Sequence, residues 1–168
     1  MDGPRPEPCA EVIRVSGEYP SARAIRTCPA PLVRVFPGEP ARVAEARAFV
    51  AAALAGCPAR EALLTCVSEL AANAITHTAS GAGGVFSVEV SRPADGRAVV
   101  SVTDEGGPGE PSVRDVDERA EGGRGLAVVG ALASRWGHHV EPGGRRTVWA
   151  EVTWPLAVRP SGPATLPT

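Results

Sequence analysis

Glu69, Asn73 and His77 stand at successive intervals of four residues and place a carboxylate, a carboxamide and an imidazole in one pattern. In a helix each interval of four turns by only about 40°, so these side chains would line one stripe. The Glu69 carboxylate can accept a proton, and the Asn73 amide oxygen suits Mg²⁺ when phosphates supply the other ligands. The stripe therefore indicates nucleotide chemistry, with a solvated helix flank as the alternative. His77 is given no catalytic role, because a helix-terminal imidazole often only interacts with the helix dipole.

Asp104 is a second candidate residue, at the point where an alternating apolar segment ends and the run DEGGPG begins. At a strand end a carboxylate can project into a pocket, while glycines let a ligand approach the backbone. An ionised carboxylate only accepts hydrogen bonds, so Asp104 would favour the amino group of adenine and reject the carbonyl of guanine. An ordinary surface turn is the alternative, because Asp and Gly are common in turns.

The run GGRGL at residues 122–126 leads directly into a helical pattern. Free backbone amides and the positive end of the helix dipole would form an anion site there, which suits phosphates. A flexible linker before a helix is the alternative. The chain contains no Lys, so a Walker-type phosphate loop is excluded and phosphate binding must use backbone amides, Arg or metal. Arg124 is then the best-placed cation at the phosphate end of this loop.

Apolar periodicity predicts the elements that must position these residues. The expected order is a strand, two helices, a turn, a hairpin, a long lid-like connection at 105–124, a helix and a last strand. Their expected bounds are 32–36, 41–55, 58–77, 80–84, 85–90 paired with 97–103, 125–136 and 147–153. In the helix at 58–77 the side chains expected to face the core are Leu63, Val67, Leu70 and Ala74.

Length and composition limit the remaining possibilities. With 168 residues, of which 43% are hydrophobic, the chain suits one core, which we place at 31–154. Residues 1–30 are expected to form a poorly ordered extension and 155–168 a disordered tail. A formal charge of -2 argues against direct nucleic-acid binding, and no apolar run is long enough to span a membrane. Four cysteines without a Cys-x-x-Cys pair favour reduced thiols in the cytoplasm.

The order of these pieces, namely an acidic and amide-bearing helix, a strand-end Asp-x-Gly, a glycine-rich loop into a helix, and Thr in a final strand, is far rarer than any one of them. As a set they resemble the GHKL superfamily of ATP-binding domains, and most closely the bacterial anti-sigma-factor type of serine/threonine kinase. The resemblance covers about residues 31–154. It implies a two-layer α/β sandwich, with a mixed, mainly antiparallel sheet and helices on one face.

The resemblance also implies residue roles, with ATP and Mg²⁺ as cofactors. Asn73 would coordinate the metal that bridges the phosphates, Asp104 would bind the adenine amino group, and Thr147 would complete the adenine pocket. Glu69 matches the family's general base, which takes a proton from an attacking hydroxyl or water. Further nucleotide-binding positions in the matching motifs are Gly106, Gly123, Gly125 and Leu126.

Two departures from the family pattern matter. The family commonly shows Asp-x-Gly-x-Gly, whereas the later glycine here falls one position further on, which bears on the lid hinge and not on the adenine contact. About 30 poorly patterned residues precede the domain, so we do not expect an autophosphorylating histidine kinase.

The leading hypothesis is a Mg-ATP-dependent serine/threonine protein kinase that regulates bacterial transcription. Its partner would be a sigma factor, an anti-anti-sigma-like protein carrying the target serine, or both. The alternative is an ATP-dependent binding switch, or a slow ATPase, that sequesters a partner without transferring phosphate to it. Whether the chain forms a homodimer stays open at this stage.

Overall fold

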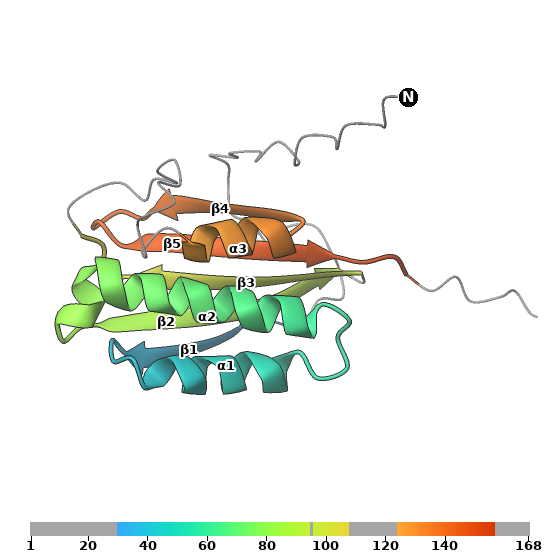
Figure 1. Cartoon of the computed structure of the whole chain (residues 1–168), viewed down its shortest axis with the longest axis horizontal. Helices are drawn as coiled ribbons and strands as arrows, with labels where there is room; N and C mark the ends of the chain where they lie inside the picture. Colours follow the sequence, from blue (N-terminus) through green and yellow to red (C-terminus); the bar gives the residue numbers. More distant parts are fainter. Residues whose placement is uncertain (1–29, 95, 108–123, 157–168) are drawn as a thin grey trace, which may run out of the picture.

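The computed structural model describes residues 30–94, 96–107 and 124–156, and these form a sheet with helices on one face (Figure 1). The described strands follow the order β1-β2-β3-β5-β4. In chain order the elements are β1 (Leu32–Pro37), α1 (Arg42–Ala53), α2 (Arg60–His77), the 3₁₀ helix η1 (Ala79–Ala82), β2 (Val85–Ala94), β3 (Arg97–Asp104), α3 (Arg124–Leu132), β4 (Arg135–Val140) and β5 (Arg146–Thr153).

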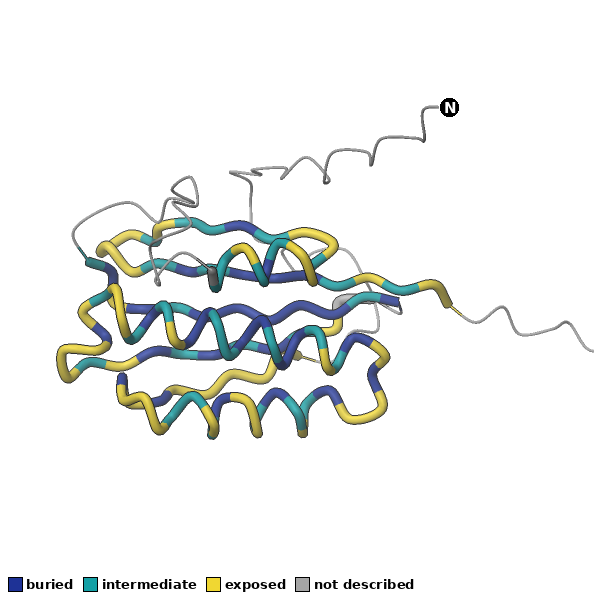
Figure 2. Tube along the Cα trace, in the orientation of Figure 1, coloured by how far each residue is buried: buried dark blue, intermediate teal, exposed yellow. Residues whose placement is uncertain are grey.

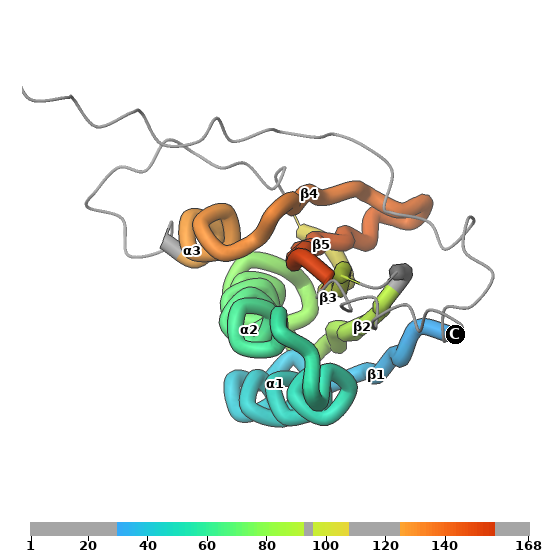
Figure 3. Tube along the Cα trace, turned by 90° about the vertical axis from the view of Figure 1, so that its right-hand side faces the viewer, coloured from blue at the N-terminus to red at the C-terminus, as the bar shows by residue number. Residues whose placement is uncertain are grey.

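The two-layer α/β fold is confirmed. Figure 3 views the molecule along the sheet and shows α1, α2 and α3 together on one side of it. The expected mixed sheet is antiparallel at all four pairings among the described strands. Both early helices, the first strand and the central hairpin lie where the periodicity predicted them, with ends shifted by a few residues.

One element was predicted wrongly. The helix expected at 125–136 ends at Leu132, and Arg135–Val140 forms β4, an edge strand paired with β5. This segment, RWGHHV, lacks a regular alternation of apolar and polar residues, and its strand form comes from pairing with β5. Trp136 consequently packs against the core from a strand, and Leu132 at the end of α3 is 39% exposed.

The core lies between the helices and one face of the sheet, and Figure 2 shows the buried positions recurring along α2 and β3. Leu63, Val67, Leu70 and Ala74 are all buried there, as the helical pattern predicted. Even-numbered residues of β3, such as Val100 and Val102, belong to this core cluster. Because side chains alternate along a strand, odd-numbered residues such as Thr103 face the opposite side of the sheet.

Two reduced cysteines lie in this core, Cys57 and Cys66, and both are buried. Burial raises the pKa of the Cys66 thiol to about 11, and the nearby negative charge of Glu69 adds to the increase. The other two cysteines of the chain lie outside the described residues. Among the described helices, none combines the length and apolar character that crossing a membrane requires.

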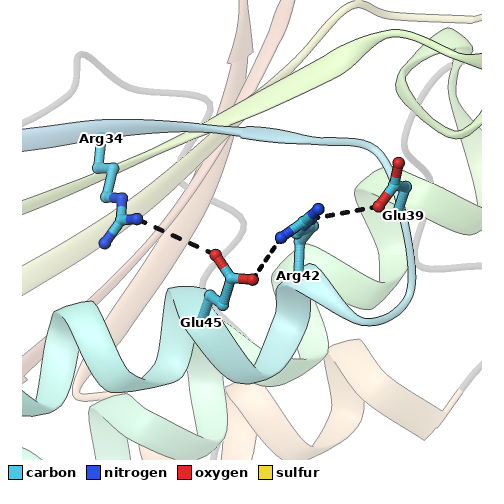
Figure 4. A network of polar contacts seen from close by, with 4 residues as sticks. All are labelled: Arg34, Glu39, Arg42 and Glu45. Carbon is cyan, nitrogen blue, oxygen red and sulfur yellow. Dashed lines mark hydrogen bonds and ion pairs between the residues drawn. The ribbon is translucent and has the colours of Figure 1, made fainter.

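A surface network joins β1 to α1 (Figure 4). Glu45 of α1 lies 2.5 Å from the Arg42 guanidinium and 4.0 Å from that of Arg34, and Arg42 also reaches Glu39 at 3.2 Å. Each of these side chains is at least 36% exposed, so water and salt screen the charges. Such pairs add little to stability, and the packing of the apolar core matters more.

Candidate functional site

Helix α2 presents Glu69 and Asn73 beside its buried stripe, as their spacing predicted. Both residues are partly buried, whereas Leu70 and Ala74, their immediate neighbours in sequence, are fully enclosed in the core. The core contacts of Leu70 and Ala74 fix the rotation of the helix about its axis. Glu69 and Asn73 are therefore held in a fixed orientation at the edge of the core.

The start of α3 meets α2 at these two side chains. A methyl group placed on Gly125 would lie 2.7 Å from Glu69 Oε2 and 3.5 Å from both polar atoms of the Asn73 carboxamide. The backbone at Gly125 therefore lies close to both side chains, which brings three predicted site residues together. The first amides of a helix have no partners within it, so α3 begins with hydrogen-bond donors close to Glu69 and Asn73.

The other predicted residues of this loop are placed less fully. Leu126 is partly buried and packs against the core cluster. Gly123, the side chain of Arg124 and most of the expected lid lie outside the described residues. Their nucleotide contacts therefore stay predictions.

Asp104 ends β3 and is only 5% exposed. Its Oδ1 accepts a hydrogen bond of 2.7 Å from the amide of Gly106, which has a φ of 74°. A side chain at Gly106 would meet the carbonyl oxygen of Gly144 at 2.1 Å, so the turn requires glycine for both conformation and space. The sequence analysis assigned Asp104 and Gly106 to one Asp-x-Gly motif, and the structure has both residues in one tight turn.

This turn is fastened to the end of the helix that carries Asn73. The Ala79 amide donates to the Gly106 carbonyl at 2.7 Å, and the Glu105 amide donates to Ser80 Oγ at 3.0 Å. Ala79 and Ser80 follow directly after α2, which ends at His77, one helical turn beyond Asn73. The strand-end carboxylate and the helical carboxamide therefore lie at the same end of the α2 and β3 pair.

Burial raises the pKa of Asp104 above its ordinary value. The hydrogen bond from Gly106 and the positive charges of Arg146 and Arg145 act in the opposite direction. A buried carboxyl at a strand end, partly supported by nearby cations, is costly for stability and is typical of functional sites. This cost favours a binding role for Asp104 over the surface-turn alternative.

Thr147 lies on the other face of the sheet from Asp104. Its register partner in β3 is Thr103, and the two Oγ1 atoms are 2.8 Å apart. Thr147 Oγ1 also donates to Glu141 at 3.0 Å. The structure does not bring Thr147 together with Asp104, and this geometry lends no support to its expected place in an adenine pocket.

Arg146 is the residue of β5 that lies opposite Asp104, and sequence reasoning missed it. It is the register partner of Asp104, so both side chains share the helix-covered face. Only the pairing of β3 with β5 reveals this, because the sequence alone does not say which residue of the last strand lies opposite Asp104. Two adjacent arginines before Thr147, in a chain without lysine, were the available signal.

The predicted magnesium site fits the residues present. Within the described part of the chain, no three His, Cys, Asp or Glu residues gather to hold a metal by themselves. Mg²⁺ in nucleotide sites keeps most of its ligands from phosphates and water, so one carboxamide such as Asn73 suffices on the protein side. Glu69 beside it adds negative charge that would favour a cation.

A comparison with family models identifies the domain. The model described as the histidine kinase-like ATPase domain matches residues 36–150, more than half of the 168 residues. The match runs from the end of β1 into β5 and includes Glu69, Asn73, Asp104 and Gly125. A search of curated proteins returned no match.

Proposed function

The chain belongs to the histidine kinase-like ATPase domain family, and on that premise we propose that it is a Mg-ATP-dependent serine/threonine protein kinase of the anti-sigma-factor type. Membership of this family supports ATP binding. The proposal adds transfer of the γ-phosphoryl group to a hydroxyl on a partner protein in the bacterial cytoplasm. That partner would be a sigma factor, or an anti-anti-sigma-like protein with a target serine.

The observation that carries the proposal is the convergence of Glu69 and Asn73 on Gly125 at the start of α3. Asn73 would hold Mg²⁺ through its Oδ1, and the metal would neutralise phosphate charge. The first amides of α3 stabilise negative charge on the same phosphates. The Glu69 carboxylate, next to both, is placed to take the proton of an attacking hydroxyl.

The transfer itself follows from these positions. The hydroxyl oxygen of the partner forms a bond to the γ-phosphorus, the bond to the β-phosphate oxygen breaks, ADP leaves, and Glu69 holds the proton. The chain contributes mainly positioning and electrostatic stabilisation, as expected for phosphoryl transfer. At the other end of the nucleotide, Asp104 accepts a hydrogen bond from the adenine amino group.

The proposal is tested with γ-labelled ATP and Mg²⁺, alone and with a panel of bacterial sigma factors and small candidate partner proteins. The wild-type chain should label serine or threonine on one partner. Glu69→Gln should still bind ATP but lose turnover by roughly 10²-fold or more. Asn73→Ala should lose the Mg-dependent part of nucleotide binding.

Glu61→Gln is the matched control, because Glu61 lies on the same helix with its side chain 75% exposed and paired with Arg60. It should leave both binding and labelling unchanged. Release of free phosphate with no labelled partner would favour the slow-ATPase alternative over the kinase. Bound ATP with neither product would favour the binding switch.

A further inference from the structure

Arg146 is held close to the turn that carries Asp104. The two residues are register partners on the helix-covered face, and Arg146 is partly buried. Its guanidinium donates a hydrogen bond to the carbonyl oxygen of Gly107. A β5 side chain therefore reaches across to the backbone just beyond Asp104.

The turn at 104–107 is held by a hydrogen bond of its own and by contacts from the segment after α2 and from β5. The Gly106 amide donates to Asp104 Oδ1 at 2.7 Å, and the Ala79 amide, after α2, donates to the Gly106 carbonyl at 2.7 Å. Arg146 of β5 supplies a further contact, at Gly107. Two side chains outside the turn contact its backbone, Ser80 at the Glu105 amide and Arg146 at the Gly107 carbonyl, and Arg146 is the charged one. A substitution can remove the Arg146 contact without altering the backbone.

The other charged groups near Asp104 either have hydrogen-bond partners elsewhere or are exposed. Glu105 points toward β2, where its Oε2 accepts from the Val85 amide at 3.3 Å. Glu141 accepts from Thr147 on the other face, and the His77 side chain is exposed at the end of α2. Arg145 is exposed as well, whereas Arg146 shares the face of Asp104. Arg146 is therefore the cation best placed to favour the ionised carboxylate.

We propose that Arg146 is a positioning residue that sets the base preference of the nucleotide site. By holding Gly107, it fixes the turn so that Asp104 meets the base as an ionised hydrogen-bond acceptor. Adenine presents an amino donor at this position, whereas hypoxanthine presents a carbonyl, which an ionised carboxylate repels. The inference rests on the proposed ATP site, and it concerns the choice of base and not the transfer of phosphate.

The consequence of removing Arg146 follows from the same chemistry. A looser turn and a less strongly ionised Asp104 would weaken the contact with adenine. A protonated carboxyl can also donate to the hypoxanthine carbonyl, so binding of that base would suffer less or improve. The ratio of the two affinities therefore reports the role of Arg146 more directly than either affinity alone.

The test measures binding of ATP and inosine triphosphate by calorimetry, with Mg²⁺, to the full chain and its variants. Arg146→Met should reduce the preference for ATP by about tenfold, the size expected for a lost charge-assisted contact. As the pH is lowered, Asp104 becomes protonated and the preference for ATP is lost. In Arg146→Met this loss should begin at a higher pH than in the wild type, a shift that a purely structural role would not produce. Arg146→Lys, which keeps the charge without the planar fork, should restore part of the preference.

Arg145→Met is the matched control, because it removes the same charge from the neighbouring exposed position and should change the ratio much less. An unchanged ratio in Arg146→Met, with ATP bound by the wild type, would overturn this inference alone. Failure of the wild type to bind ATP would overturn the proposed function and this inference with it. If Arg146→Met does not fold, Arg146→Gln removes the charge and keeps a donor for the Gly107 carbonyl, and a wild-type ratio in this variant at every pH would overturn the inference.

Discussion

At the ends of β3 and β5, two adjacent cross-strand pairs face opposite sides of the sheet and differ in chemistry. Asp104 and Arg146 lie on the helix-covered side, whereas Thr103 and Thr147 lie on the other. The threonine hydroxyls hydrogen-bond to each other, and Thr147 also reaches Glu141. Asp104 and Arg146 instead engage the backbone of a glycine turn.

The two pairs differ in what their burial costs the fold. The threonine pair is neutral, and its hydroxyls are satisfied by each other and by Glu141, so it stabilises the sheet without an energetic penalty. Asp104 is a buried carboxyl whose pKa burial raises, which means that folding opposes its charge. A side chain kept at such a cost is expected to be used, and ATP binding by the family gives it a use.

The largest effect is expected from Arg97→Met, on the threonine side of the sheet. Arg97 Nε donates to Glu151 at 2.7 Å, and the Glu151 side chain is only 4% exposed. Removing the arginine leaves a buried carboxylate unpaired, which should lower the free energy of unfolding by about 3 kcal/mol. Urea denaturation measures the loss. ATP affinity should stay unchanged, and a parallel loss of ATP affinity in the folded variant would contradict the separation of the two faces.

Asp104→Asn should give the next largest effect, with opposite signs for binding and stability. Asn keeps an acceptor for the Gly106 amide but presents an amide donor toward the adenine amino group, so ATP affinity should fall by about 2 kcal/mol, or roughly 30-fold. Calorimetry with ATP measures this fall. Wild-type affinity in the variant would remove Asp104 from the nucleotide site.

The same variant should be more stable than the wild type at neutral pH. Because the folded pKa of Asp104 lies above its ordinary value of 3.8, its contribution to stability is fully present below pH 3.8 and is lost as the pH rises through the folded pKa. Asparagine does not ionise, so the variant does not lose this stability as the pH rises. Thermal unfolding across pH should therefore show a gain at neutral pH that vanishes near and below pH 3.8.

Thr147→Val should give the smallest effect. It removes a hydroxyl that contacts Thr103 and Glu141, so the free energy of unfolding should fall by about 1 kcal/mol. The affinity for ATP should stay within about twofold of the wild type, since less than 0.5 kcal/mol separates such values. A loss of affinity as large as that of Asp104→Asn would return Thr147 to the adenine pocket and contradict the assignment of faces.

Sequence patterns were sufficient where the signal was local. Helix α2 carries eighteen residues of regular periodicity, which fixed both its core side and the stripe of Glu69 and Asn73. Asp104 followed from the end of an alternating strand. By contrast, β4 has no such alternation, and its state depends on a partner strand that follows it in the chain.

The sequence did not predict which face of the sheet each residue of β5 occupies. Which residue of β5 shares a face with Asp104 depends on the register between two strands far apart in sequence, and a slip of one residue exchanges the faces. Family resemblance pointed to Thr147, whereas the residue that shares the face of Asp104 is Arg146. Local chemistry thus identified the helix and the acid, and only three-dimensional pairing identified the arginine.

The buried thiol of Cys66 has a practical consequence. With a pKa of about 11, it is almost entirely protonated in ordinary buffers, and alkylating reagents attack the thiolate. Modification at this cysteine therefore requires α2 to separate from the sheet for a moment. The same helix carries Glu69 and Asn73. The rate of alkylation at Cys66 therefore measures how often this part of the candidate site opens.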